Sequence, residues 1–177
     1  MILSYFAYGE FDKRSKVKIA NKYNNSIINF ISGDQLNIEN EMIKIINAKD
    51  KTYSPLALYF LLDNNIINSK EKINSLFDIL INETKVDKEI KNLIIYKKAL
   101  YNSEFETENN LLKILNPIIN SESIWKSHAL YLMAEYFLSK NEKQKSKEFF
   151  EKILILENSN PQIKLEAQKR IQRDFSE

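Results

Sequence analysis

Hydrophobic positions along this chain recur with helical spacing in nearly every segment. Ile73, Phe77 and Leu80, for example, are three or four residues apart and therefore share one face of a helix. Short polar stretches interrupt the pattern, and Ser54-Pro55 is typical of a helix start, with a serine cap and a proline in the first turn. The pattern predicts nine helices, at about residues 4–30, 36–48, 54–62, 69–80, 87–101, 108–119, 123–138, 144–156 and 162–173.

Two segments of the chain, 56–79 and 133–156, follow the same pattern. With an offset of 77 positions they match at Ala57/Ala134, Tyr59/Tyr136, Phe60/Phe137, Leu61/Leu138, Asn64/Asn141, Ser69/Ser146, Lys70/Lys147 and Glu71/Glu148. Similarity at a fixed offset indicates a repeat architecture, and two periods of about 38 residues are near the ~34 residues of a tetratricopeptide unit. We expect the small residues where two helices of one hairpin touch, and the aromatic residues between hairpins.

The nine helices are predicted to form about four hairpins, which begin near residues 17, 54, 88 and 125, followed by a capping helix. Short connections force neighbouring helices to be antiparallel. The last helix has Ile163, Ala167 and Ile171 on one side and charged residues elsewhere, which is typical of the end of a solenoid. The predicted fold is therefore all-α, a tetratricopeptide-like stack of hairpins with a C-terminal cap.

Composition and charge mainly exclude other classes of protein. With 44% hydrophobic and 28% charged residues the chain resembles an ordinary globular protein, and its two glycines and three prolines argue against β-hairpins. The net charge of +2, and the acidic residues interleaved with lysines over 140–152, argue against nucleic-acid binding. The chain has no cysteine, and its one histidine, His128, has no catalytic partner in the pattern. We expect no enzyme activity, cofactor or metal site.

The first eight residues, MILSYFAY, form an apolar and aromatic run. Eight residues are too few to cross a bilayer, which takes about 20, and the run lacks the charged start and the cleavage site of a signal peptide. One interpretation is a hydrophobic start to the first helix. The other is the end of a membrane-spanning helix that begins before this chain, with Tyr5, Phe6 and Tyr8 as its interfacial aromatic belt.

The first helix of each hairpin lines the concave face of a tetratricopeptide stack. The predicted groove consists of Ser54, Leu58, Leu62, Leu93, Tyr96, Leu100, His128, Tyr131 and Glu135. Such a partly apolar groove would bind an extended or helical peptide segment of another protein. We expect Leu58, Tyr96 and Tyr131 to contribute most, because anchors of this kind dominate binding surfaces. The alternative is that these leucines and tyrosines belong to the hydrophobic core.

Three local features also carry a family resemblance. The apolar start continues into a long helix that contains Ala20-Asn21-Lys22-Tyr23, residues 51–57 read KTYSPLA, and residues 125–156 form the last hairpin. Together they are similar to the tetratricopeptide-like inner-membrane family of Gram-negative bacteria known as the ancillary translocon subunit. The chain departs from the repeat pattern in having Asn141 instead of glycine in the turn, and in placing Pro161 late.

The resemblance implies an organisation, a location and a function. Residues 1–8 would be the remnant of a membrane anchor and residues 9–177 the repeat domain, in a single-pass inner-membrane protein with its domain in the periplasm. Its partners would be subunits of the export channel, chaperones or client segments. The basic stretch 13–18 would instead place the domain in the cytosol by the positive-inside rule. The alternative function is a periplasmic or cytosolic scaffold for envelope assembly or cell division.

Overall fold

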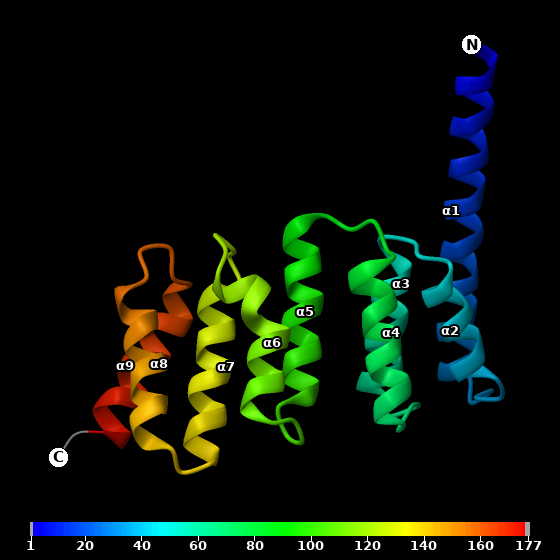
Figure 1. Cartoon of the computed structure of the whole chain (residues 1–177). Coiled ribbons are helices and arrows are strands. Elements are labelled where there is room, and N and C mark those ends of the chain that lie inside the picture. The colour runs from blue at the N-terminus through cyan, green and yellow to red at the C-terminus, as the bar shows by residue number, and fades with distance from the viewer. Residues whose placement is uncertain (1, 176–177) are drawn as a thin grey trace. The chain divides into compact units, whose positions relative to one another are not determined.

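The computed structural model describes the backbone of residues 2–175 and the side chains of residues 14–175. Within this part of the chain every regular element is an α-helix (Figure 1). The nine helices are α1 (Ile2–Ile31), α2 (Ile38–Asn47), α3 (Tyr53–Asp63), α4 (Lys70–Asn82), α5 (Lys88–Asn102), α6 (Glu108–Ile119), α7 (Lys126–Ser139), α8 (Lys143–Ile155) and α9 (Pro161–Asp174). The all-α fold predicted from the hydrophobic periodicity is confirmed.

The helices form two compact units, Met1–Val86 and Asp87–Glu177. The predicted membrane anchor, residues 1–8, lies outside the described side chains, and the boundary proposed after residue 8 falls inside helix α1. Among the residues that the structure describes, no helix combines the length and the apolar character that a membrane span requires.

In the first unit, α2 and α3 form the tightest pair, and α4 packs against both. The hydroxyl of Ser54, which is fully buried, donates to the Ile45 carbonyl at 2.8 Å, so a small residue lets α3 approach α2 closely. The predicted pairing of α3 with α4 is therefore not the closest contact. Leu58 and Phe77 are fully buried in this unit.

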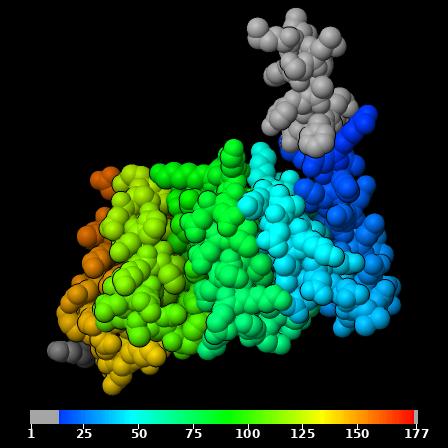
Figure 2. Space-filling view, turned by 45° about the vertical axis from the view of Figure 1, so that its right-hand side comes forward, coloured from blue at the N-terminus to red at the C-terminus, as the bar shows by residue number. Residues whose placement is uncertain are grey.

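Helix α1 packs against α2 and α3 and ends at Ile31, close to the end near residue 30 that the periodicity predicts, and Gly33 lies in the turn that follows. The Phe30 and Phe60 rings meet edge to face, with centroids 5.1 Å apart. Gly33 has φ +89°, a backbone conformation that glycine adopts readily and other residues rarely do. One flank of α1 meets α2 and α3, and the other flank is open (Figure 2). The open flank carries the exposed Ile28 and Ile31.

In the second unit, α5 pairs with α6 and α7 pairs with α8, as predicted, and α9 covers α8 and α7 (Figure 1). The buried Ser146 of α8 donates to the Ala134 carbonyl of α7 at 2.8 Å. This confirms that small residues mark the contact between the two helices of the last hairpin. Phe150, on the same face of α8 as Ser146, is fully buried between α7, α8 and α9.

The structural similarity between the two segments ends at the turn that follows α3 and α7, although the aligned residues beyond the turn are still identical. Ala57 and Ala134 are both fully buried, so the first helices are alike. Ser69, aligned with Ser146, is instead an exposed N-cap of α4 that accepts a hydrogen bond from the Lys72 amide at 3.2 Å. Residues 64–69 connect α3 to α4, whereas residues 140–142 suffice between α7 and α8. The longer connection moves the aligned serine out of the helix contact.

Candidate functional site

Three of the nine predicted groove residues belong to α3, in the first unit. Ser54 and Leu58 are fully buried, and Leu62 is half-buried. Ser54 uses its hydroxyl to bind the Ile45 carbonyl, and Leu58 is part of the hydrophobic core of this unit. Since a fully buried side chain presents no surface, Ser54 and Leu58 are not available to a partner in this structure.

The other six predicted residues belong to α5 and α7, in the second unit. On α5, Leu93, Tyr96 and Leu100 follow a spacing of three and four residues and share one face. Leu93 and Tyr96 are half-buried, and Leu100 is 43% exposed. Unlike Leu58, these three side chains therefore keep part of their apolar surface open.

The structure brings Tyr96 and His128 together and adds Trp125 to them. The Tyr96 ring stacks on Trp125 with centroids 6.0 Å apart, and it meets the edge of His128 at 5.8 Å. Trp125 and His128 lie 5.0 Å apart. We call these three residues the aromatic cluster; all three are half-buried. The cluster joins the first helices of two successive hairpins.

Sequence reasoning did not assign Trp125 to the groove. This residue stands at the N-cap position of α7, before the periodic run begins, so the hydrophobic pattern does not place it. A signal was nevertheless present: Trp125 is three residues before His128, and residues three apart lie on the same face of a helix. It is also the only tryptophan of the chain.

A polar network fixes the start of α7 against α5 and thereby positions the cluster. One Glu89 carboxylate oxygen accepts hydrogen bonds from the Ser123 hydroxyl at 2.8 Å and from the Ile124 amide at 3.2 Å. Ser123 in turn accepts from the Asn92 amide at 3.0 Å and from the Trp125 backbone at 3.1 Å. Asn92 and Ser123 are buried, and such satisfied networks hold a local arrangement rigid.

The aromatic cluster is uncharged at neutral pH. Burial lowers the pKa of the His128 imidazole below its usual value, and the Ile124 carbonyl acts weakly in the opposite direction. Burial also raises the pKa of the Tyr96 hydroxyl. Both groups therefore stay neutral near pH 7, so the cluster presents uncharged aromatic rings.

The last two predicted residues are engaged by other helices of the chain: Glu135 by α9 and Tyr131 by α8. Arg170 of α9 pairs with both oxygens of the Glu135 carboxylate, at 2.7 and 2.6 Å. Tyr131 packs its ring against Phe150, at 5.4 Å. Burial, together with the neighbouring Glu135, raises the pKa of Tyr131 to about 12. The sequence analysis predicts charged residues away from the apolar side of the last helix, and it does not predict this pairing of Arg170.

Two observations complete the description of possible sites. Among the described residues, no three histidine, cysteine, aspartate or glutamate side chains gather as a metal site would require. Comparison with models of known protein families, with curated proteins and with solved structures gives no match for this chain.

Proposed function

We propose that the protein is a non-catalytic protein-interaction module whose second unit binds a peptide segment of a partner at the aromatic cluster. The observation that carries this proposal is the half-buried trio of Tyr96, Trp125 and His128 across α5 and α7. Leu100, one turn along α5 from Tyr96, and Ile124, next to Trp125, are 43% and 64% exposed. Aromatic side chains with an open apolar border are the usual anchors of protein interfaces.

The chemistry of the cluster favours a segment with an aliphatic or aromatic anchor. The faces of the three rings supply apolar contact area at a small cost in side-chain entropy, since each ring is already packed against another. Either a helical or an extended segment can present such an anchor.

The first prediction concerns partner binding at this surface. Replacing Trp125 with alanine is expected to weaken binding at least tenfold, because truncation of a central aromatic anchor typically costs about 2 kcal/mol or more. The partner is first captured in cells by a photo-crosslinking residue placed at Leu100, and its affinity is then measured with purified proteins by calorimetry.

Two further variants separate binding from folding. Leu100→Asp changes an exposed side chain and should weaken binding without altering the helix content, whereas Leu165→Ala, on the 45% exposed side chain of α9, should leave the affinity unchanged. Unchanged affinity in both the Trp125 and the Leu100 variants, with folding retained, would exclude the aromatic cluster as the binding surface.

The proposal extends to location and partners. The protein would act as an adaptor that is anchored in the inner membrane by one N-terminal helix, with its repeat domain in the periplasm near the export translocon. Its partners would be channel subunits, chaperones or client segments. The support for this part is the resemblance carried by residues 1–8, 20–23, 51–57 and 125–156.

The second prediction tests this location in cells that express the native protein. The protein is expected to stay in the membrane pellet after carbonate extraction, and its repeat domain is expected to be cleaved by protease added to spheroplasts. A membrane-bound but protected domain would put it on the cytosolic side, as the basic stretch 13–18 suggests. Release by carbonate would contradict the anchor and favour the periplasmic or cytosolic scaffold.

A further inference from the structure

The open flank of α1 carries a narrow stripe of exposed side chains. Positions 17, 21, 24, 28 and 31 follow one another at steps of four and three residues, which places them along one side of the helix. Val17, Ile28 and Ile31 are 53%, 62% and 77% exposed, and Asn21 and Asn24 between them are exposed as well. We call these five residues the α1 seam.

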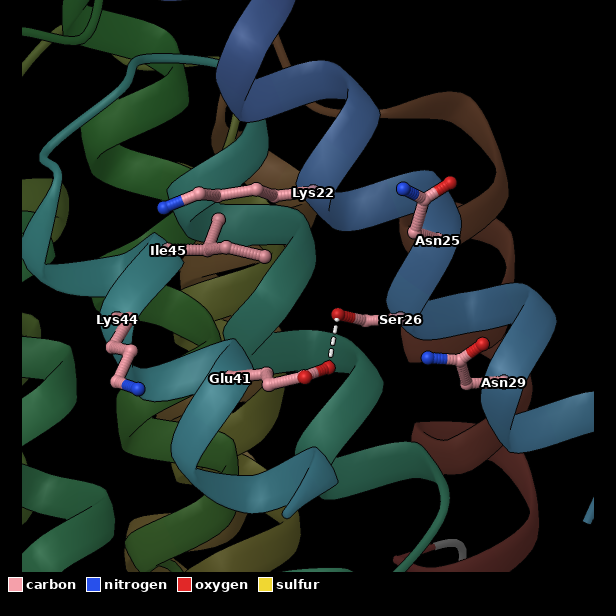
Figure 3. A pocket seen from close by; sticks show the side chains of 7 residues that line it. All are labelled: Lys22, Asn25, Ser26, Asn29, Glu41, Lys44 and Ile45. Atoms are coloured by element: carbon pink, nitrogen blue, oxygen red, sulfur yellow. Dashed lines mark hydrogen bonds between the residues drawn. The ribbon is translucent and has the colours of Figure 1, made fainter. Parts of the chain in front are cut away.

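The opposite side of α1 is fixed within the first unit. Ser26 is almost fully buried, and its hydroxyl donates to the Glu41 carboxylate of α2 at 2.7 Å (Figure 3). The Tyr23 and Tyr53 rings join α1 to α3 with centroids 5.6 Å apart. Successive residues of a helix turn by about 100°, so Ser26, two residues from the nearest seam positions, points away from the α1 seam. The seam therefore faces outward on a helix that is held in place.

The spacing of the α1 seam is typical of a helix that pairs with another helix. Alternating steps of four and three residues are the a and d positions of a heptad, at which the side chains of one helix pack between those of a second. A terminal helix of a helical stack normally has a polar outer face. Three exposed aliphatic side chains on the outer face of α1 therefore indicate a surface that a partner covers.

The two asparagines of the seam argue against a lipid surface as that partner. Hydrocarbon offers an amide no hydrogen-bond partner, and burial of an amide without one is costly. A facing protein helix, in contrast, can supply polar side chains, and an asparagine at an a position sets the register of paired helices in this way. The α1 seam therefore fits a protein helix better than a membrane.

The charge along α1 indicates the charge of the partner helix. Residues 13–33 include five basic residues and no acidic one. Arg14 and Lys18, which are one turn apart, stand at the N-terminal end of the seam, and both are exposed. A second copy of this stretch would bring no opposite charge to Arg14 and Lys18, whereas acidic residues of another helix would complement them.

We propose that the α1 seam binds an amphipathic helix of a protein partner, whose aliphatic residues pack on those of the seam and whose acidic residues lie beside Arg14 and Lys18. Asn21 and Asn24 then lie between the two helices, where their amides hydrogen-bond to polar side chains of the partner. The surface consists of first-unit residues alone, so the inference stands independently of the aromatic cluster in the second unit.

The third prediction tests this surface by nuclear magnetic resonance titration of the full chain with two synthetic peptides. Both peptides consist of heptads with leucine at the a and d positions, and they differ only in carrying glutamate or lysine at the e and g positions. Repulsion between like charges at e and g keeps each peptide from pairing with itself. We expect the glutamate peptide to shift the backbone signals of residues 14–31, and the lysine peptide to bind more weakly by about tenfold or more, because it repels the basic end of the seam.

Variants at exposed positions separate the apolar part of the surface from the charged part. Ile28→Asn removes an aliphatic contact and should weaken binding of the glutamate peptide by about tenfold. Lys18→Glu should weaken the glutamate peptide by about threefold and strengthen the lysine peptide by a similar factor, because the reversed charge exchanges attraction for repulsion. Ile155→Asn and Lys113→Glu, at exposed positions of the second unit, are the matched controls and should change neither affinity.

Several results would overturn the proposal. One is the absence of shifts at residues 14–31 with either peptide, and another is an equal response to both peptides. Shifts of the same signals that depend on protein concentration without any peptide, and that Ile28→Asn abolishes, would show that a second copy of the chain covers the seam. Binding to phosphatidylglycerol vesicles that is lost in Ile28→Asn would assign the seam to a lipid surface instead.

Discussion

Replacing Phe150 with alanine is expected to lower the free energy of unfolding of the second unit by about 3–5 kcal/mol. The side chain is fully buried, and its ring meets Tyr131 at 5.4 Å and Phe175 at 6.2 Å. It lies within the core that α7, α8 and α9 share, so its truncation leaves a cavity beneath the last helix. The loss of unfolding free energy is largest if the surrounding helices cannot move into the cavity.

The measurement is urea unfolding followed by tryptophan fluorescence. Trp125 is the only tryptophan and belongs to the second unit, so its emission reports the unfolding of that unit. Leu165→Ala is the matched control, because this α9 side chain is 45% exposed and its truncation should cost less than about 1 kcal/mol. Equal destabilisation by the two substitutions would contradict the packing of α9 described above.

Phe150 also links the core of the second unit to the residues that were predicted for the groove. The Arg170 guanidinium lies 6.0 Å from the Phe150 ring and pairs with Glu135 at 2.6 Å. Through these contacts α9 covers the end of the α7 face on which Tyr131 stands. Two members of the aromatic cluster, Trp125 and His128, lie toward the start of α7.

The helices could be predicted from the sequence because each carries an apolar stripe of helical period. The stripe on α4 that includes Ile73, Phe77 and Leu80 is buried as expected, and the predicted end of the first helix near residue 30 agrees with the end of α1 at Ile31. The hydrophobic period depends only on residues that are close along the chain. A helix can therefore be predicted from it even when the elements that pack against the helix are not known.

Which surface of a helix meets which neighbour depends on distant residues, and here prediction was less successful. Leu58 fits the groove pattern as well as Leu100 does, yet Leu58 is fully buried while Leu100 stays exposed. Glu135 was expected in the groove, and Arg170, 35 residues later, pairs with it. Trp125 was not predicted as a groove residue, because it precedes the periodic part of α7.

The two aligned serines show most clearly that local sequence does not determine which neighbour a residue meets. Ser146 is fully buried where α8 touches α7, whereas Ser69 caps the exposed start of α4. Both serines are followed by Lys-Glu. Local sequence alone therefore predicts the same structural role for the two serines. The lengths of the preceding connections, 64–69 and 140–142, account for the difference.

The same substitution at the two serines should therefore have very different effects. Ser146→Leu is expected to lower the free energy of unfolding by about 3 kcal/mol, because the larger side chain must fit where the serine hydroxyl lies 2.8 Å from the Ala134 carbonyl. Ser69→Leu removes only a helix cap at an exposed position and should cost about 1 kcal/mol.

Urea unfolding followed by far-ultraviolet circular dichroism measures both variants, and Trp125 fluorescence isolates the effect of Ser146→Leu on the second unit. Ser146→Ala keeps the site small and should recover most of the stability, losing only one buried hydrogen bond, worth about 1 kcal/mol. Equal costs for the two leucine variants would mean that the serines occupy equivalent positions after all. A larger cost at Ser146 means that the contact between α7 and α8, rather than the shared sequence, determines what each serine does.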